Sequence, residues 1–250
     1  MCRFLGYLGP PATLASVVLD PPHSLLRQAW APRHQRAGAV NADGFGVGWY
    51  DLDRRAEPAR YRTTRPIWSD RSFASLAGLV ASPAVLAALR DATPPAPIEE
   101  SGTPPFTAGR WLFAHNGAVD GYGTDPSIRI RLRRLVPDEE AAGIEGAADS
   151  ELLFALALGP LRAGAGLGEA LASVVTAVLG VTGARLNMVV TDGRELAATS
   201  CGDSLFVLEG DGRVVVASEP YDDDPAWRPV PEGSMVQAGP ERVTIGAVHP

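Results

Sequence analysis

Runs of apolar residues, alternating or continuous, are concentrated toward both ends of the chain, and this pattern predicts β-strands there. Asp-Gly, Gly or Pro turns separate the runs. The expected strands are residues 2–9, 41–50, 59–65, 85–93, 110–117, 185–191, 195–200, 204–208, 213–217 and 234–245.

The middle of the chain changes to a helical pattern. Residues 152–158 are apolar all round, which is typical of a buried helix, and residues 167–179 form an amphipathic one. Asp149 or Ser150 would by default cap the first of these helices. Shorter helices are expected at residues 24–30 and 71–79, with a helical or irregular segment at 14–19.

Three polar stretches connect these elements. Residues 94–105 are rich in proline and long enough to be a functional loop. The strand at 110–117 ends in Asn116-Gly117, a strong turn signal. Residues 120–148 are polar and interrupted by glycines, so we expect them to be the most mobile region. No domain boundary is visible, which predicts one domain over residues 1–250.

Composition narrows the class of protein. The chain has 250 residues and a formal net charge of −7, which suits a soluble globular domain with a sizeable core. No basic segment precedes an apolar run, and no stretch approaches ~18 apolar residues, so we expect no signal peptide and no membrane span. Cys2 and Cys201 could form one bridge at most, which favours a reducing cytoplasm.

The absence of lysine and the spacing of the histidines and cysteines exclude several catalytic mechanisms. The chain has no lysine, which rules out a Schiff base, a pyridoxal phosphate anchor and a P-loop lysine. Its four histidines form no HExxH motif and there are no paired cysteines, so we expect no metal and no cofactor. The acidic balance argues against nucleic-acid binding. The basic cluster at residues 129–134 is interpreted as a solvated face, the alternative being a contact for an anionic partner.

Cys2 is the strongest candidate for chemistry. Methionine aminopeptidase usually removes Met1 when the next side chain is small, as cysteine is. The remaining residue would hold a thiol nucleophile and, in its own α-amine, a base with a pKa of about 8. The alternative is a small apolar side chain in a core strand.

The segment at 41–50 places glycines at 44, 46 and 48 on one face of a strand. Such a face lets something approach the backbone closely. Either a ligand lies against it or another layer of the protein packs tightly on it, and the pattern alone does not choose. The GxGxG spacing, with no helix after it, is not a dinucleotide-binding fingerprint.

Five motifs then follow one another along the chain. They are Cys2, the glycine-rich segment at 41–49, Arg90-Asp-Ala-Thr93, His115-Asn116-Gly117 and Asp149-Ser-Glu151. Each is weak alone, but in this order they resemble the class II (N-terminal cysteine) glutamine amidotransferase domain of the Ntn-hydrolase superfamily, over essentially the whole chain. The resemblance implies an α+β fold: a four-layer αββα sandwich of two antiparallel sheets flanked by helices.

The resemblance also implies roles for individual residues. The Cys2 thiol would attack the γ-carbonyl of a glutamyl amide, and Asn116 and Gly117, presented by their turn, would form the oxyanion hole. The glutamyl group would be bound by the remaining motif residues. These are Arg90 on the α-carboxylate with Thr93 beside it, Asp149 on the α-ammonium, and His115, Asp43 and Gly44 along the slot.

Further stretches resemble the branch of the family that hydrolyses γ-glutamyl-hercynylcysteine or its sulfoxide in ergothioneine biosynthesis. They are Met1-Cys-Arg, Val18-Leu-Asp-Pro-Pro22, Thr103-Pro-Pro-Phe-Thr107, Ala114-His-Asn-Gly-Ala-Val-Asp120 and Ala217-Ser-Glu-Pro-Tyr-Asp-Asp-Asp224. This likeness implies a small-molecule γ-glutamyl substrate and release of glutamate. Two alternatives stay open: a glutaminase supplying ammonia to a separate synthetase, and a silent module that binds γ-glutamyl compounds.

The leaving group of such a substrate carries a quaternary ammonium beside a carboxylate. Aromatic faces attract quaternary ammonium groups, and Trp68, Tyr221 and Trp227 are the candidates for that wall. Arg3 is a candidate for the carboxylate. The alternative for residues 221–224 is a solvated turn.

Overall fold

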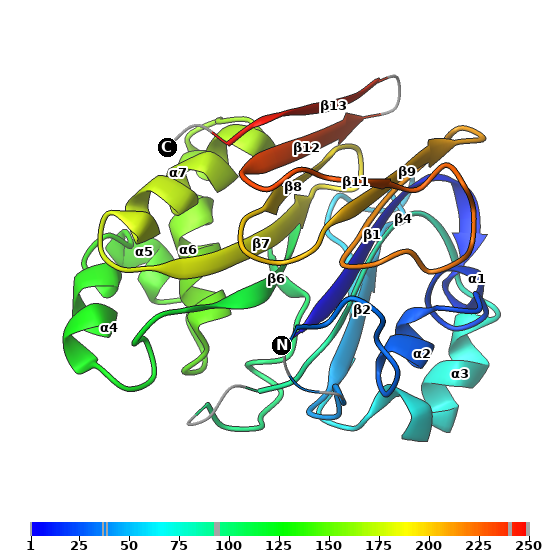
Figure 1. Ribbon diagram of the computed structural model, residues 1–250, viewed down its shortest axis with the longest axis horizontal. Helices are drawn as coiled ribbons and strands as arrows, with labels where there is room; N and C mark the ends of the chain where they lie inside the picture. The colour runs from blue at the N-terminus through cyan, green and yellow to red at the C-terminus, as the bar shows by residue number, and fades with distance from the viewer. Residues whose placement is uncertain (1, 37, 39, 93–95, 240–241, 249–250) are drawn as a thin grey trace.

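The computed structural model describes residues 2–36, 38, 40–92, 96–239 and 242–248, and these form two β-sheets packed face to face (Figure 1). Within these residues the strands of both sheets pair in antiparallel fashion. Thr93, expected beside the glutamyl slot, lies outside the described residues.

The first sheet has seven strands in the order β11-β9-β10-β1-β4-β2-β3. Its central strands are β1 (Arg3–Thr13) and β4 (Ala81–Leu89), which pair from Arg3–Leu89 onward. The other strands are β2 (Phe45–Trp49), β3 (Ala59–Thr63), β9 (Phe206–Gly210), β10 (Arg213–Ala217) and β11 (Arg228–Pro229). The N-terminal strand is therefore held in the middle of the sheet, with its first residues at one edge of the layer.

The second sheet has six strands in the order β13-β12-β8-β7-β6-β5. They are β5 (Phe106–Ala108), β6 (Trp111–Val119), β7 (Ala184–Thr191), β8 (Leu196–Ser200), β12 (Ser234–Gly239) and β13 (Arg242–Ala247). The apolar run at 234–245, expected as one strand, is split into the pair β12 and β13.

Helices cover the outer face of each sheet. The first sheet carries α1 (Leu14–Val18), α2 (Leu25–Gln28), the 3-10 turn η1 (Ile67–Ser69) and α3 (Arg71–Ala77). The second carries α4 (Pro126–Arg133), α5 (Asp138–Ala141), α6 (Asp149–Arg162) and α7 (Leu167–Leu179). The expected four-layer αββα sandwich is confirmed, and Figure 1 shows the two helical groups on opposite sides.

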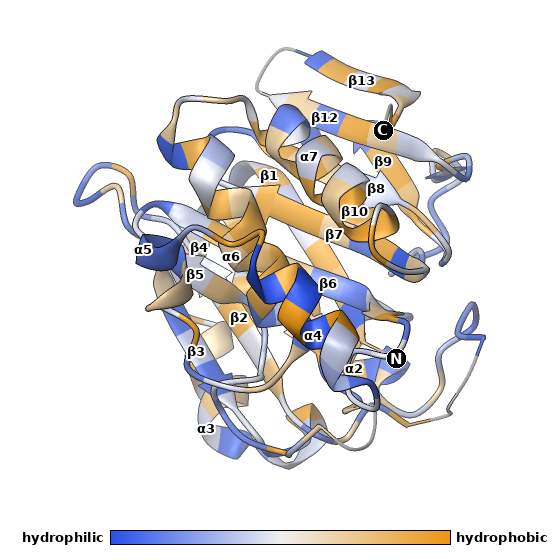
Figure 2. Ribbon diagram, turned by 90° about the vertical axis from the view of Figure 1, so that its left-hand side faces the viewer, coloured by the Kyte–Doolittle hydropathy of each residue, from blue (hydrophilic) through white to orange (hydrophobic). Residues whose placement is uncertain are grey.

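Three apolar clusters fill the three interfaces between the layers. In β1, Phe4 and Leu8 face the second sheet, whereas Leu5 and Tyr7 face the helices on the other side, as strand alternation requires. The inner strands are largely apolar (Figure 2). Each sheet is thus buried on both faces, which explains why its strands read as nearly continuous apolar runs.

The glycine-rich strand β2 packs against protein along its bare face. A Cβ on Gly48 would lie 2.5 Å from Cδ1 of Leu112, which belongs to the opposite sheet, and one on Gly46 would collide with the Pro104 carbonyl. Tight packing of another layer is therefore the reading that the structure supports for these two glycines.

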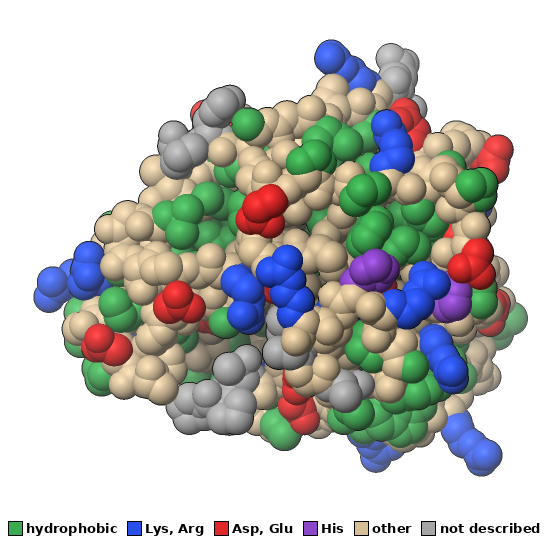
Figure 3. All heavy atoms as spheres, in the orientation of Figure 1, with side chains coloured by type: hydrophobic (Ala, Val, Ile, Leu, Met, Phe, Trp, Pro, Cys, Tyr) green, Lys and Arg blue, Asp and Glu red, His purple; other side chains and the backbone are tan. Residues whose placement is uncertain are grey.

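The longest apolar helix, α6, is buried, as its sequence pattern predicted, and lies beside α7 on the outer face of the second sheet. It extends four residues beyond the expected end at residue 158 and contains Pro160. None of the helices in the described ranges is long and apolar enough to cross a membrane. The outer surface seen in Figure 3 carries interspersed positive and negative side chains.

Candidate active site

A pocket of about 180 Å³ lies where β1 begins and where β4 and β6 end, close to the start of α6. Four of the residues expected from the sequence line it: Cys2, Arg90, Gly117 and Asp149. The 96–104 segment closes another side of the pocket. Residues separated by almost 150 positions in the chain therefore meet around one small space.

Cys2 stands directly before β1, in the pocket lining and outside the apolar clusters of the described core. Burial raises the pKa of its thiol, and the negative charge of Asp149 acts in the same direction. The charge of the amino terminus, a backbone hydrogen bond from Asp91 and the Arg90 guanidinium act in the opposite direction. The thiol is therefore protonated at neutral pH, and a nucleophilic role requires a base to take its proton.

Asn116 and Gly117 lie inside β6, so the expected turn at this position is wrong. The strand continues to Val119, with Asn116 opposite Asn187 and Gly117 opposite Leu186 of β7. Glycine is needed at 117 because a Cβ there would collide with the Arg185 carbonyl. The Asn-Gly pair thus reflects a close approach between two strands, which uses the same residue type that a turn would.

The Asn116 side chain is fully buried, and neither its Oδ1 nor its Nδ2 has a hydrogen-bond partner among the described residues. Leaving a buried amide unsatisfied costs about 1–3 kcal/mol. Such a cost is typical of groups held ready for a ligand or a reacting atom.

His115 is buried and connects its own strand, β6, to two neighbouring elements. Its Nε2 lies 2.9 Å from the Arg185 carbonyl, which can only accept, so Nε2 carries the proton. Nδ1 then accepts from Ser150 Oγ at 3.0 Å. With both ring nitrogens occupied, His115 ties β6 to β7 and to the start of α6. His115 is not in the pocket lining, and these contacts give it a supporting position beside the site; its contact with substrate stays a prediction.

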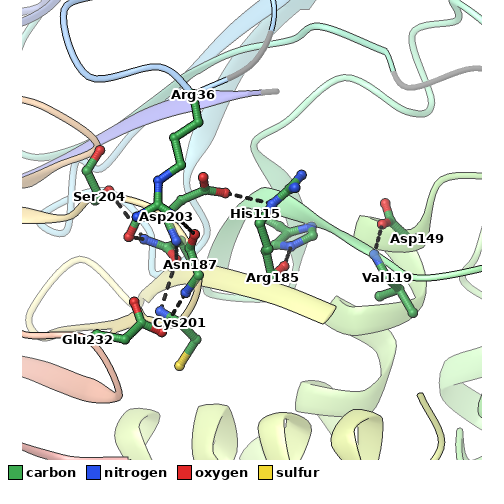
Figure 4. Close-up of polar contacts among 11 residues, drawn as sticks. Arg36, His115, Val119, Asp149, Arg185, Asn187, Cys201, Asp203, Ser204 and Glu232 are labelled. Atoms are coloured by element: carbon green, nitrogen blue, oxygen red, sulfur yellow. Dashed lines mark hydrogen bonds and ion pairs between the residues drawn. The ribbon is translucent and has the colours of Figure 1, made fainter. Parts of the chain in front are cut away.

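A polar cluster behind His115 fixes the same region of β7. The Arg185 guanidinium pairs with buried Asp203 at 3.1 Å, and Asn187 Nδ2 donates to the Asp203 carbonyl at 2.8 Å (Figure 4). The Asn187 Oδ1 accepts from the backbone N–H groups of Cys201 and Asp203. Unlike Asn116, the neighbouring Asn187 has both amide atoms satisfied, so its role is structural.

Arg90 directly follows β4 and is buried at the pocket wall. Its guanidinium donates to the Pro97 carbonyl at 2.7 Å, which holds the side chain against the 96–104 segment. Asp43 and Gly44 lie behind it: the Gly44 carbonyl accepts from the Arg90 N–H, and the Asp43 carboxylate accepts from the Ala92 N–H at 2.8 Å. They support Arg90 from the rear and do not appear in the pocket lining.

Asp149 is the first residue of α6, and the N-cap is Ala148. One oxygen accepts from the Val119 N–H at 3.0 Å (Figure 4). The other accepts from the Ser150 N–H at 2.8 Å. These hydrogen bonds fix a carboxylate at the pocket while leaving each oxygen a second lone pair. A cationic group in the pocket could therefore bind there.

The expected leaving-group residues are not brought to this pocket. Trp68 packs edge-on against Trp30 at the molecular surface, with ring centroids 5.7 Å apart. Tyr221 is buried against Trp227 in the cluster beneath α1 and α2. Arg3 points away from the pocket because it lies on the same face of β1 as Leu5, and its Nε donates to Gln35. The positions of these residues in the sequence do not show whether they lie near Cys2 in the folded protein.

The lining also contains residues that the sequence did not mark as binding residues, among them Tyr122, Arg129 and Ser150. The first two belong to the segment expected to be most mobile, which instead contains α4 and α5. Arg129 was interpreted as part of a solvated basic face, although its place in a helix facing the motif residues could not be read from spacing. Across the described residues, His, Cys, Asp and Glu side chains form no group of three suited to a metal ion.

The sequence and the fold of this chain are both similar to those of one class of known proteins. Residues 14–210 match the family described as glutamine amidotransferases class-II. A glutamine aminotransferase class-II domain protein from Silicibacter pomeroyi has a similar solved structure, with a TM-score of 0.70, 27% identity and full coverage of both chains. The chain belongs to the class II glutamine amidotransferase family, as its motifs predicted.

Two curated relatives are more specific. The chain is 43% identical to the gamma-glutamyl-hercynylcysteine sulfoxide hydrolase of Mycobacterium tuberculosis, over 99% of this chain and 97% of that protein. It is 42% identical to the protein of the same name from Mycolicibacterium smegmatis, over 98% and 99% of the two chains. The branch expected from the sequence is therefore the branch that these relatives represent.

Proposed function

We propose that this protein hydrolyses the γ-glutamyl amide bond of γ-glutamyl-hercynylcysteine sulfoxide and releases glutamate and hercynylcysteine sulfoxide. The main support for this proposal is one observation. Cys2, Gly117, Arg90 and Asp149 converge on a single pocket in a chain that matches hydrolases of that name along almost its whole length. We further propose that residues 1–250 act as one domain, in the cytoplasm.

The reaction begins at Cys2, once Met1 has been removed. The free α-amine takes the thiol proton, directly or through a water, and sulfur adds to the γ-carbonyl carbon. Because burial raises the pKa of this thiol, little thiolate exists beforehand, and the base acts as the bond forms. The negative charge that develops on the carbonyl oxygen is stabilised by the Asn116 side-chain amide and the Gly117 N–H.

The intermediate collapses when the amine returns its proton to the departing nitrogen. The C–N bond breaks, the leaving amine departs, and a glutamyl thioester remains on Cys2. Water then attacks the thioester carbonyl, the α-amine accepts the proton of that water, and glutamate leaves as the thiol is restored. The chemistry needs no metal and no cofactor, because one residue supplies the nucleophile and the base.

The glutamyl end is bound by the two fixed charges of the pocket. Arg90, held by the Pro97 carbonyl, receives the α-carboxylate, and Asp149 receives the α-ammonium. Both side chains are oriented by backbone groups before substrate arrives, so little conformational entropy is lost on binding.

The Arg90→Lys variant tests this slot. An ammonium group cannot reproduce the planar fork of a guanidinium, so we expect KM for the γ-glutamyl substrate to rise by about tenfold or more. The same exchange at Arg228, an exposed residue outside the pocket, should leave the kinetics unchanged. Steady-state glutamate release measures both, and unchanged KM in Arg90→Lys would remove Arg90 from the slot.

The substrate assignment is tested by comparing leaving groups. A dedicated hydrolase should have a kcat/KM for γ-glutamyl-hercynylcysteine sulfoxide that exceeds the value for glutamine by orders of magnitude. The glutaminase alternative requires the opposite, since glutamine would be its own substrate. Equal glutamate release from the two compounds would overturn our assignment in favour of the glutaminase.

A further inference from the structure

Arg129 is the second arginine in the lining of the pocket, besides Arg90. The two come from different parts of the molecule: Arg90 follows β4 in the first sheet, and Arg129 lies in α4, on the outside of the second (Figure 1). They also differ in their surroundings. The Arg90 guanidinium is buried and held by carbonyl groups, whereas Arg129 is exposed and its guanidinium makes no hydrogen bond or ion pair within the described part of the chain.

The region around Arg129 keeps this cation from being neutralised. The charges of Asp149 and Arg129 both affect the pKa of Tyr122, which also lines the pocket. Burial raises its pKa to about 12, the Asp149 charge adds to the increase, and Arg129 opposes it. The phenol is therefore neutral at physiological pH. Within the described residues Asp149 forms no ion pair with Arg129, and its oxygens accept from backbone N–H groups.

The space beside Arg129 continues out of the pocket. A second hollow of about 380 Å³ shares Tyr122, Arg129 and Ala147 with the first. Its other walls include the apolar side chains of Ile144 and Leu152 and the two arginines Arg133 and Arg134. Arg129 thus stands at the junction between the space that contains Cys2 and a larger, partly apolar space along α4.

The chemistry of a γ-glutamyl amino acid matches this arrangement. Its scissile amide nitrogen is bonded to a carbon that itself carries a carboxylate. The substrate therefore has two carboxylates, one on each side of the bond that breaks, and glutamine has only the glutamyl one. Two separated carboxylates require two separated cations, and the pocket lining contains two arginines from opposite sides.

We propose that Arg129 binds the carboxylate of the leaving amino acid and thereby makes the enzyme select γ-glutamyl amino acids over glutamine and other simple γ-glutamyl amides. This inference rests on the proposed γ-glutamyl hydrolase function and identifies the residue that recognises the leaving group.

The test uses two substrates that differ only in the charge concerned: γ-glutamyl-alanine and γ-glutamyl-alaninamide. The wild-type enzyme should prefer the acid. In Arg129→Gln, kcat/KM for the acid should fall by about tenfold, because Arg129 is partly solvated in the free enzyme and a charged hydrogen bond there has a modest effect. The value for the amide should stay the same. Arg131→Gln, on the same helix but outside both hollows, is the matched control and should preserve the preference.

Three results would overturn the assignment of Arg129. They are no preference in the wild type, no change in Arg129→Gln, and an equal loss on both substrates, which would indicate a structural role. The outcome is independent of the identity of the natural substrate. If the betaine substrate is no better than glutamine while the acid preference still depends on Arg129, the proposed function fails and this inference stands.

Discussion

Cys2→Ala is expected to abolish hydrolysis while substrate still binds. The variant keeps a small second residue, so Met1 is still removed and the α-amine remains, but no sulfur is available to form the thioester. Arg90 and Asp149, the residues proposed to bind the glutamyl group, are held by backbone contacts that do not involve Cys2. Calorimetry should therefore detect binding of the intact γ-glutamyl substrate, and a glutamate assay should detect no turnover.

Cys201 provides the control for that experiment. It follows β8, outside the pocket lining, and burial raises the pKa of its thiol to about 11, which leaves it unreactive at neutral pH. Cys201→Ser should retain most activity. Substantial hydrolysis by a clean Cys2→Ala preparation, or an inactive Cys201→Ser, would mean that the nucleophile has been assigned to the wrong residue.

Asn116→Asp should lower kcat by at least about 10²–10³-fold, the typical effect of losing one oxyanion-hole donor. The exchange preserves the shape of the side chain but replaces the N–H donor with an oxygen beside the developing negative charge. Because Asn116 has no hydrogen-bond partner among the described residues, shortening it to alanine should cost little stability. The Asn116→Ala variant should then show a similar loss of kcat with a melting temperature close to the wild-type value.

Asn187, opposite Asn116 in the sheet, gives the contrasting result. Its side chain satisfies the backbone around Cys201 and Asp203, so Asn187→Ala should lower the melting temperature, since buried groups lose their partners. A stability loss in Asn116→Ala as large as that in Asn187→Ala, with kcat retained, would contradict the oxyanion role.

The fold was predictable where periodicity and burial act together. The apolar run after Asp149 and the amphipathic run at 167–179 became α6 and α7, and the strand pattern at both ends became the two sheets. Local signals failed where long-range packing decides the outcome. Asn116-Gly117 has the composition of a turn, but the Arg185 carbonyl of a strand distant in sequence makes glycine necessary within β6.

The candidate site was likewise predictable in part. Motif order identified Cys2, Arg90 and Asp149, which the structure places in one pocket. The leaving-group side could not be identified this way, because no motif marks it. Trp68 and Tyr221 have suitable chemistry but pack elsewhere, whereas Arg129 entered the pocket through the position of α4, which only the tertiary structure defines.

In the proposed mechanism the N-terminal residue of the active enzyme is Cys2, and its sulfur attacks the glutamyl carbon. A glutamine analogue with a γ-diazoketone alkylates such a nucleophile and loses dinitrogen, so intact-mass and peptide mass spectrometry of the labelled enzyme test the claim directly. We expect a chain without Met1 that carries one adduct, located on Cys2, with no label on Cys2→Ala and full labelling of Cys201→Ser. An active enzyme that retains Met1, or an adduct on any other residue, would contradict the account.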